Sequence, residues 1–198
     1  MTASHELILG GQRSGKSRRA EGLAQAWLQG GVGREAVLLA TALAGDAEMA
    51  QRIARHRQDR AARVPGMQTA EEPRALPVAL QRLSRPGTLV VVDCLTVWLG
   101  NWLMPLEGSG INAPQPAPVQ ALLEALVRAE GPVVLVSNEI GLGVIPLGYE
   151  VRAFVDALGH LNQAVAGVCD RVTFMAAGLP LPLKGALQPV ARHPGDIT

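Results

Sequence analysis

The feature that most constrains this chain is the segment GGQRSGKS at residues 10–17, which fits the pattern G-x-x-x-x-G-K-[ST]. It directly follows the apolar run Leu7-Ile8-Leu9 and directly precedes a stretch of helical period, so it is placed as a strand-to-helix loop. Glycines let such a loop turn successive amide N–H groups inward, and the following helix presents the positive end of its dipole. The segment therefore predicts a loop that binds the phosphates of ATP or GTP.

Each residue type in this loop has a chemical role. Lys16 is expected to reach the outer phosphates and to act in catalysis, and the Ser17 hydroxyl is expected to ligate Mg²⁺. The alternative is a glycine-rich turn that binds nothing, but the position between a strand and a helix favours the phosphate site. We assign the whole loop to nucleotide binding: Gly10, Gly11, Gln12, Arg13, Ser14, Gly15, Lys16 and Ser17.

A carboxylate at the end of a second apolar run belongs with this loop. Residues 89–92 are apolar and are followed by Asp93, as expected for a neighbouring strand that brings an acidic side chain to the nucleotide and its Mg²⁺. An Asp in this position can also cap a helix, and such a helix would start near Leu95. The metal interpretation is favoured because the phosphate loop is already present.

Short β-rich runs alternate with longer stretches of helical period, which is typical of a parallel sheet covered by helices. Strands are expected at residues 6–10, 36–41, 88–93, 132–137 and 171–175. Helices are expected at residues 16–29, 46–60, 73–83, 119–130 and 150–168. The prediction is an α/β fold of P-loop NTPase type (RecA-like), with a mostly parallel sheet, in a single domain over residues 1–198. Residues 105–118 are expected to form a surface loop and residues 189–198 a loose tail.

The charge and cysteine content of the chain indicate which kinds of ligand and which compartment to expect. The formal net charge is +1, so no global field favours nucleic acid, and small molecules are the expected ligands. Cys94 and Cys169 lack metal-ligand spacing and are expected to be reduced thiols in a cytoplasmic protein. The amino terminus has no targeting pattern, and no membrane span is expected. The longest apolar stretch, residues 89–106, is interrupted by Asp93, Gly100, Asn101 and Pro105.

An arginine-rich segment surrounds one histidine. In the helix expected at residues 46–60, His56 shares a narrow sector with Met49 and Ile53. Neighbouring guanidinium groups would keep the imidazole neutral and would attract a triphosphate. On periodicity alone, however, His56 is better interpreted as a packed residue and the arginines as a solvated face. The arginines are Arg52, Arg55, Arg57 and Arg60.

Several further segments, taken together, resemble one family. The chain is similar over nearly its whole length to the bifunctional adenosylcobinamide kinase and adenosylcobinamide-phosphate guanylyltransferase family of the cobalamin pathway. SNEIGLG at residues 137–143 and MAQRIARH at residues 49–56 are the most restrictive matches, whereas residues 60–67 depart from the family pattern. Other matching segments are residues 10–18, 40–42, 69–73, 92–99 and 154–163.

The resemblance implies two reactions and a set of residues. A corrinoid hydroxyl would take the γ-phosphoryl group of ATP or GTP, and His56 would then carry GMP as a covalent intermediate to the cobinamide phosphate. The family also implies a homotrimer. The residues added to the nucleotide site are Thr41, Ala42, Arg57 and Arg60.

Guanine recognition requires a carboxylate that accepts hydrogen bonds from N1 and the exocyclic amine. Glu71 is the candidate, and the adjacent Glu72 is the alternative that reads as ordinary charge at the start of a helix. Glu139 is expected to orient Mg²⁺ or a nucleophile, or else Gly141 and Gly143 only shape the turn that follows it.

Two other functions share the phosphate loop. One is a different small-molecule kinase in which His56 is structural, and the other is a nucleotide-dependent switch that signals to a partner. Both differ from the family interpretation at His56, because neither needs a covalent GMP intermediate.

Overall fold

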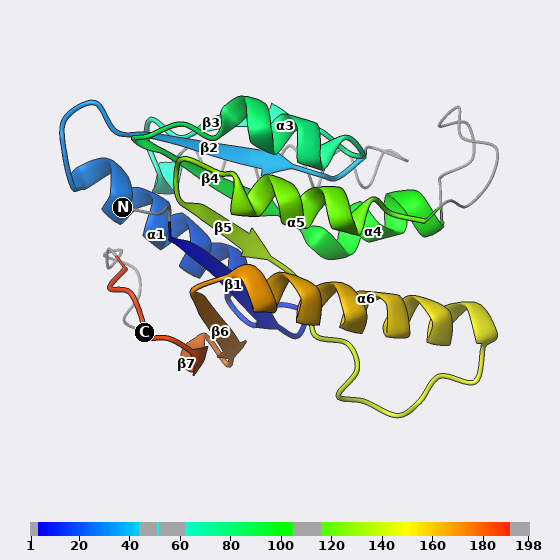
Figure 1. The fold of residues 1–198 in the computed structure, drawn as a ribbon. Coiled ribbons are helices and arrows are strands. Elements are labelled where there is room, and N and C mark those ends of the chain that lie inside the picture. The colour runs from blue at the N-terminus through cyan, green and yellow to red at the C-terminus, as the bar shows by residue number, and fades with distance from the viewer. Residues whose placement is uncertain (1–3, 44–50, 52–61, 105–115, 191–198) are drawn as a thin grey trace.

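The computed structural model describes residues 4–43, 51, 62–104 and 116–190, and its strands form one sheet (Figure 1). The strand order is β3-β2-β4-β5-β1-β6-β7. The strands are β1 (His5–Gly10), β2 (Glu35–Ala40), β3 (Gln68–Glu71), β4 (Thr88–Asp93), β5 (Val133–Val136), β6 (Arg171–Ala176) and β7 (Leu179–Lys184). The helices are α1 (Lys16–Gln29), α3 (Leu76–Leu83), α4 (Leu95–Leu103), α5 (Val119–Val127) and α6 (Tyr149–Val168).

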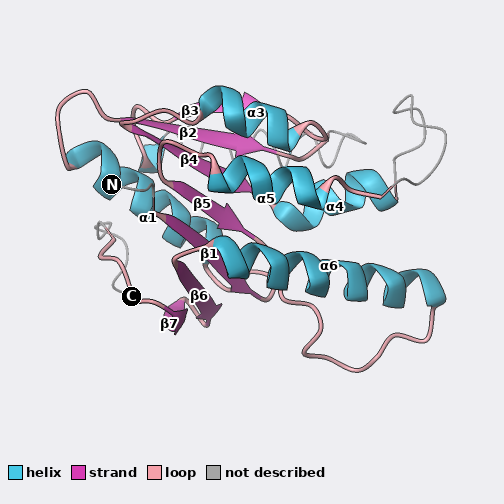
Figure 2. Ribbon diagram, viewed as in Figure 1, coloured by secondary structure: helices cyan, strands magenta, loops and turns pink. Residues whose placement is uncertain are grey.

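The sheet confirms the predicted α/β class. Strands β1 to β6 pair in parallel, and only β7 at one edge runs antiparallel, against β6. Figure 2 shows helices on both faces of the sheet, which is what parallel strands require because both of their faces are buried. The sheet is therefore mostly parallel and flanked by helices, as the alternation of patterns predicted.

Alternate residues of the strands feed two separate cores. In β1, Leu7 and Leu9 pack with α3, α4, α5 and α6 on one face, with Trp98 fully buried among them. Ile8 points to the opposite face and packs with Leu23 of α1. This alternation follows from the period of two in a strand. The continuous apolar runs of the central strands thus supply both cores at once.

The expected elements agree with the structure within a few residues wherever it describes them. Helix α1 has the predicted bounds, and α3 begins later than the predicted residue 73. Strands β3 and β7 were not predicted, because the short polar run QTAE and the proline-containing run LPLPLK lack the apolar signal of a central strand. Both occupy edges of the sheet. The helix expected at 46–60, apart from residue 51, lies outside the described residues, as do most of 105–118 and 191–198.

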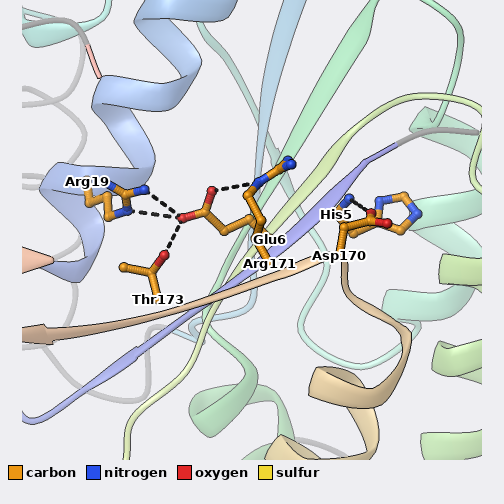
Figure 3. A network of polar contacts seen from close by, with 6 residues as sticks. All are labelled: His5, Glu6, Arg19, Asp170, Arg171 and Thr173. Carbon is orange, nitrogen blue, oxygen red and sulfur yellow. Dashed lines mark hydrogen bonds and ion pairs between the residues drawn. The ribbon is translucent and has the colours of Figure 1, made fainter. Parts of the chain in front are cut away.

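A buried ionic network joins β1, β6 and α1 (Figure 3). The Glu6 side chain is 1% exposed, and its Oε1 accepts hydrogen bonds from Arg19 Nε at 3.0 Å and Nη2 at 2.9 Å. Thr173 Oγ1 donates to the same oxygen at 2.8 Å, and Arg171 Nε lies 3.5 Å from Oε2. Two guanidinium groups and a hydroxyl therefore compensate one carboxylate. The network ties the first turn of α1 to two central strands.

We predict that Arg19→Leu lowers the free energy of unfolding by about 3–5 kcal/mol, because it leaves the buried Glu6 carboxylate without its main partner. The control is Arg128→Leu, which breaks the exposed pair between Arg128 and Glu124 of α5. That change is expected to cost less than about 1 kcal/mol. Urea denaturation of both variants measures the difference, and similar losses would contradict a dominant role for the buried pair.

Candidate active site

The carboxyl ends of five parallel strands meet at one edge of the sheet. Residues paired across this edge, from β3 to β1, are Glu71, Ala40, Asp93, Val136 and Ile8. Ligands of open α/β sheets bind beyond the carboxyl ends of the strands. The loop 10–17 follows β1 at this same edge, so the register gathers the predicted Thr41, Glu71 and Asp93 on the side of the sheet where the loop lies.

The backbone of the loop 10–17 requires glycine at Gly10 and Gly15. Gly15 has φ +100°, and it precedes Lys16, the first residue of α1. A Cβ at Gly10 would clash with the carbonyl oxygen of Met175, so the loop packs directly against β6. The Gly178 N–H also donates to the carbonyl of Ser14 at 3.0 Å. The turn between β6 and β7 therefore supports the loop from one side.

Lys16 is buried and lies across the loop. Its Nζ donates to the carbonyl oxygens of Gly10 at 3.0 Å and Gly11 at 2.6 Å. Burial lowers the pKa of the Lys16 ammonium, and the nearby Cys94 and Asp93 act in the opposite direction. The Lys16 side chain thus holds a positive charge at the centre of the loop, at the start of α1. A cation next to the amino terminus of a helix is an arrangement that favours the binding of an anion.

Ser17 and Asp93 come together as predicted. The Ser17 hydroxyl donates to Asp93 Oδ2 at 3.4 Å, although the two residues are 76 positions apart in sequence. The expectation that β4 is the direct neighbour of β1 is wrong, because β5 lies between them. The N-cap residue of α4 is Cys94, so the alternative in which Asp93 is that cap is wrong as well. Helix α1 crosses β5, and its residue Ser17 thereby brings a hydroxyl to the Asp93 carboxylate.

This pair of oxygen ligands fits Mg²⁺. Mg²⁺ is commonly held by one or two protein carboxylates together with phosphate oxygens and water. A carboxylate and a hydroxyl at the mouth of the loop supply that kind of donor set. Ser17 and Asp93 are the candidate metal ligands because their oxygens lie in contact at the start of α1. Across the described ranges, no cluster of three or more His, Cys, Asp or Glu side chains is found.

Thr41 is fully buried, and its hydroxyl hydrogen-bonds the backbone of Cys94, the residue that follows β4. It accepts from the Cys94 N–H at 2.9 Å and donates to the Cys94 carbonyl at 2.8 Å. The Thr41 N–H also donates to the Asp93 carbonyl at 3.2 Å. The structure therefore gives the Thr41 side chain a positioning contact beside Asp93. Ala42 follows it at the same edge, partly buried.

Two adjacent glutamates have different surroundings. Glu72 Oε1 accepts hydrogen bonds from the N–H groups of Arg74 at 3.1 Å and Ala75 at 2.8 Å. It therefore stabilises the turn that leads into α3, which confirms its interpretation as helix-start charge. Glu71 is exposed at the end of β3, with β2, β4 and β5 between it and β1. Its role with guanine stays a prediction.

Glu139 links the end of β5 to the loop 10–17. Its N–H donates to the Gly10 carbonyl at 3.1 Å, and its carboxylate accepts the Gly141 N–H at 3.1 Å. The carboxylate thus hydrogen-bonds the backbone of the turn that follows it. Its orientation of Mg²⁺ or of a nucleophile stays a prediction, as does the shaping of the turn by Gly141 and Gly143. His56, Arg57 and Arg60 lie outside the described residues.

Polar residues of α4 and α6 support the site and were not predicted. Asn101 of α4 donates to the carbonyls of Thr41 at 2.8 Å and Pro73 at 2.9 Å. Thr96 Oγ1 accepts the Asn138 N–H at 2.8 Å, and Asn162 of α6 donates to the Asn138 carbonyl at 3.0 Å. For Asn101 the available signal was an amide side chain within the otherwise mostly apolar run LTVWLGNWL, since a buried amide is seldom without partners. Thr96 and Asn162 had no such signal.

Cys94 and Cys169 are free thiols. In the part of the chain that the structure describes, none of the helices combines the length and the apolar character needed to cross a bilayer.

Comparison with known proteins points to one family. The family model described as cobinamide kinase / cobinamide phosphate guanyltransferase matches residues 6–183. The bifunctional adenosylcobalamin biosynthesis protein CobP of Pseudomonas aeruginosa is 48% identical over 180 residues, covering 91% of this chain and 97% of that protein. The proteins named CobU from Salmonella typhimurium and Escherichia coli are 33% and 32% identical, and each alignment covers 90% of this chain and 98% of the relative.

We predict that the Cys94 thiol reacts slowly with iodoacetamide at neutral pH. Burial, and secondarily the Asp93 carboxylate, raise the pKa of Cys94 to about 11, so the reactive thiolate is scarce. In a Cys169→Ala background, the alkylation rate followed by mass spectrometry should keep rising up to about pH 11. Asp93→Asn should shift that profile to lower pH, and a wild-type profile that levels off near the ordinary value of 9.0 would contradict the burial argument.

Proposed function

The chain belongs to the cobinamide kinase / cobinamide phosphate guanyltransferase family, and we propose that it phosphorylates adenosylcobinamide with ATP or GTP and then transfers GMP from GTP to the product, giving adenosylcobinamide-GDP. The observation that carries this proposal is the contact of Ser17 with Asp93 beside Lys16. It places a hydroxyl, a carboxylate and an ammonium at the start of α1, as phosphoryl transfer requires.

In the kinase reaction, the loop 10–17 acts as the phosphate-binding loop. Its amide N–H groups and the Lys16 ammonium stabilise the charge that spreads over the transferred phosphoryl oxygens. Mg²⁺ held by Ser17 and Asp93 would add further charge neutralisation. The hydroxyl of the aminopropanol arm attacks the γ-phosphorus as the bond to the leaving nucleoside diphosphate breaks, and the hydroxyl proton passes to water.

In the guanylyl transfer, His56 is the nucleophile. A bond forms between its neutral imidazole and the α-phosphorus of GTP as pyrophosphate leaves. An oxygen of the cobinamide phosphate then attacks the same phosphorus and releases His56. Arg57 and Arg60 favour the approach of the anionic phosphates, Glu71 accepts hydrogen bonds from guanine, and Thr41 and Ala42 border the nucleotide. These roles rest on the family's motifs.

Two properties of the whole molecule go with this proposal. Family resemblance supports a homotrimer, and the free thiols of Cys94 and Cys169 are compatible with a reducing cytoplasm.

We predict that GTP labelled on the α-phosphate leaves an acid-labile, alkali-stable label on the protein. The label should be absent from His56→Ala, because that variant lacks the nucleophile, while equilibrium binding of GTP should remain within a few-fold of wild type. Denaturation followed by acid and alkali treatment of the labelled protein provides the measurement.

GTP labelled on the γ-phosphate is the control, since its label should leave with pyrophosphate. Equal labelling of His56→Ala from the α-phosphate would move the nucleophile to another residue. Absence of the label from wild type in the presence of Mg²⁺ would remove the guanylyltransferase activity from the proposal.

We predict that Asp93→Asn shifts the Mg²⁺ dependence of the kinase reaction to higher concentration and lowers kcat by about 100-fold or more, because one metal-binding charge is lost. Lys16→Ala provides the contrast. It should weaken triphosphate binding at every Mg²⁺ concentration, since it removes a point charge and leaves the metal ligands in place. Mg²⁺ titrations of initial rate separate the two effects, and an unchanged Mg²⁺ midpoint in Asp93→Asn would argue against a metal ligand.

A further inference from the structure

A hollow of about 460 Å³ lies between α6 and the segment that joins β5 to it. In Figure 1 this segment is the yellow-green loop that leaves the end of β5 and returns to the start of α6. The volume of the hollow is within the range of about 300–1,000 Å³ that is common for small-molecule sites. The residues that line it include Ile140, Val144, Ile145, Asp156, His160 and Gln163.

The hollow adjoins the loop 10–17. The Ser137 N–H donates to the Ile8 carbonyl at 3.0 Å, and the Glu139 N–H donates to the Gly10 carbonyl at 3.1 Å. Ile140, the next residue, already lines the hollow. A molecule bound there therefore lies beside the loop in which the proposed function places the phosphates.

The segment presents aliphatic side chains to the exterior without a covering element among the described residues. Val144 and Leu147 are each 97% exposed, and Leu142 and Ile145 are also exposed. Aliphatic side chains concentrated in this way mark a binding surface more often than scattered single ones do. Val144 and Ile145 of this segment line the hollow together with the polar residues Asp156 and Gln163 of α6.

Contacts with α6 hold the segment in place. Arg152 of α6 donates to the carbonyl of Pro146 at 2.9 Å and also to the carbonyl of Leu147. These bonds tie the distal half of the segment to the first turn of α6, while Glu139 ties the proximal half to the loop 10–17. The hollow between the two attachments is therefore pre-formed, as ligand sites usually are.

We propose that this hollow binds the corrinoid acceptor, an inference that rests on the function proposed above. A corrinoid carries methyl groups around its ring and carboxamide side chains at its periphery. The aliphatic side chains of Ile140, Val144 and Ile145 would cover one methyl-bearing edge. The side chains of Asp156, His160 and Gln163 would hydrogen-bond the carboxamides. One edge bound in this place leaves the aminopropanol arm free to extend toward Lys16.

The test measures cobinamide binding to the full-length protein with a non-hydrolysable GTP analogue present. Ile145→Asp puts a carboxylate among the aliphatic groups, and Asp156→Ala removes a hydrogen-bond acceptor. Each should raise the Kd for cobinamide by at least about tenfold. GTP affinity and labelling from the α-phosphate should stay unchanged in both. The control Val127→Asp alters an equally exposed valine on α5, which does not line the hollow, and should leave cobinamide binding unchanged.

Three outcomes would overturn the assignment. They are wild-type affinity for cobinamide in both variants, an equal loss in Val127→Asp, or dissociation of the oligomer by Ile145→Asp in analytical ultracentrifugation. The last would mean that a second copy of the chain covers the segment. If wild type itself binds no cobinamide, the proposed function fails, and this result is distinct from wild-type binding that the variants leave intact.

Discussion

The buried pairing of Glu6 with Arg19 fixes where α1 begins, and the geometry of the candidate site depends on that position. Arg19 follows Lys16 by three residues, so one helical turn carries the Lys16 ammonium, the Ser17 hydroxyl and the Arg19 guanidinium that pairs with Glu6. A charge in the interior is strongly unfavourable without its partner, and α1 cannot slide along the sheet without separating the pair. The helix therefore meets Asp93 across β5 in a constant geometry.

The same reasoning explains why polar residues remote from the loop belong to the site. Asp93 is held by its own strand, but the strand end is held by Thr41, whose hydroxyl bonds both the N–H and the carbonyl of Cys94. Asn101 in turn bonds the Thr41 carbonyl. Each buried polar group hydrogen-bonds the next. The Asp93 carboxylate at the end of its strand is therefore positioned by Thr41 and Asn101, which lie 52 and 8 positions from it in the sequence.

Local patterns were sufficient to locate the loop 10–17 and Asp93 at the ends of strands, because each is identified by a run of contiguous residues. They were insufficient for β3, whose polar run QTAE becomes a strand only by pairing with β2. Local patterns also did not identify Asn101 as a site residue, because its role is to donate hydrogen bonds to two carbonyls from other segments of the chain. Asp93 was placed correctly beside Ser17 although its strand was wrongly taken as the neighbour of β1. Residue pattern specifies which group ends a strand, whereas strand order is a property of the assembled sheet. His56, Arg57 and Arg60 rest on motif resemblance alone, because the structure does not describe them.

A two-step transfer places a geometric demand on the acceptor. The alcohol that is phosphorylated in the first reaction becomes, as a phosphate, the nucleophile in the second, so the reacting end of the acceptor must reach two phosphorus atoms in turn. An acceptor held by its bulky end, away from the reacting arm, satisfies this demand, because the arm can move while the ring stays bound. The segment from Ile140 to Leu147 is attached to the loop 10–17 through Glu139 and to α6 through Arg152. Such a double attachment keeps a ring-binding surface at a constant distance from the phosphates, which links the hollow to both reactions.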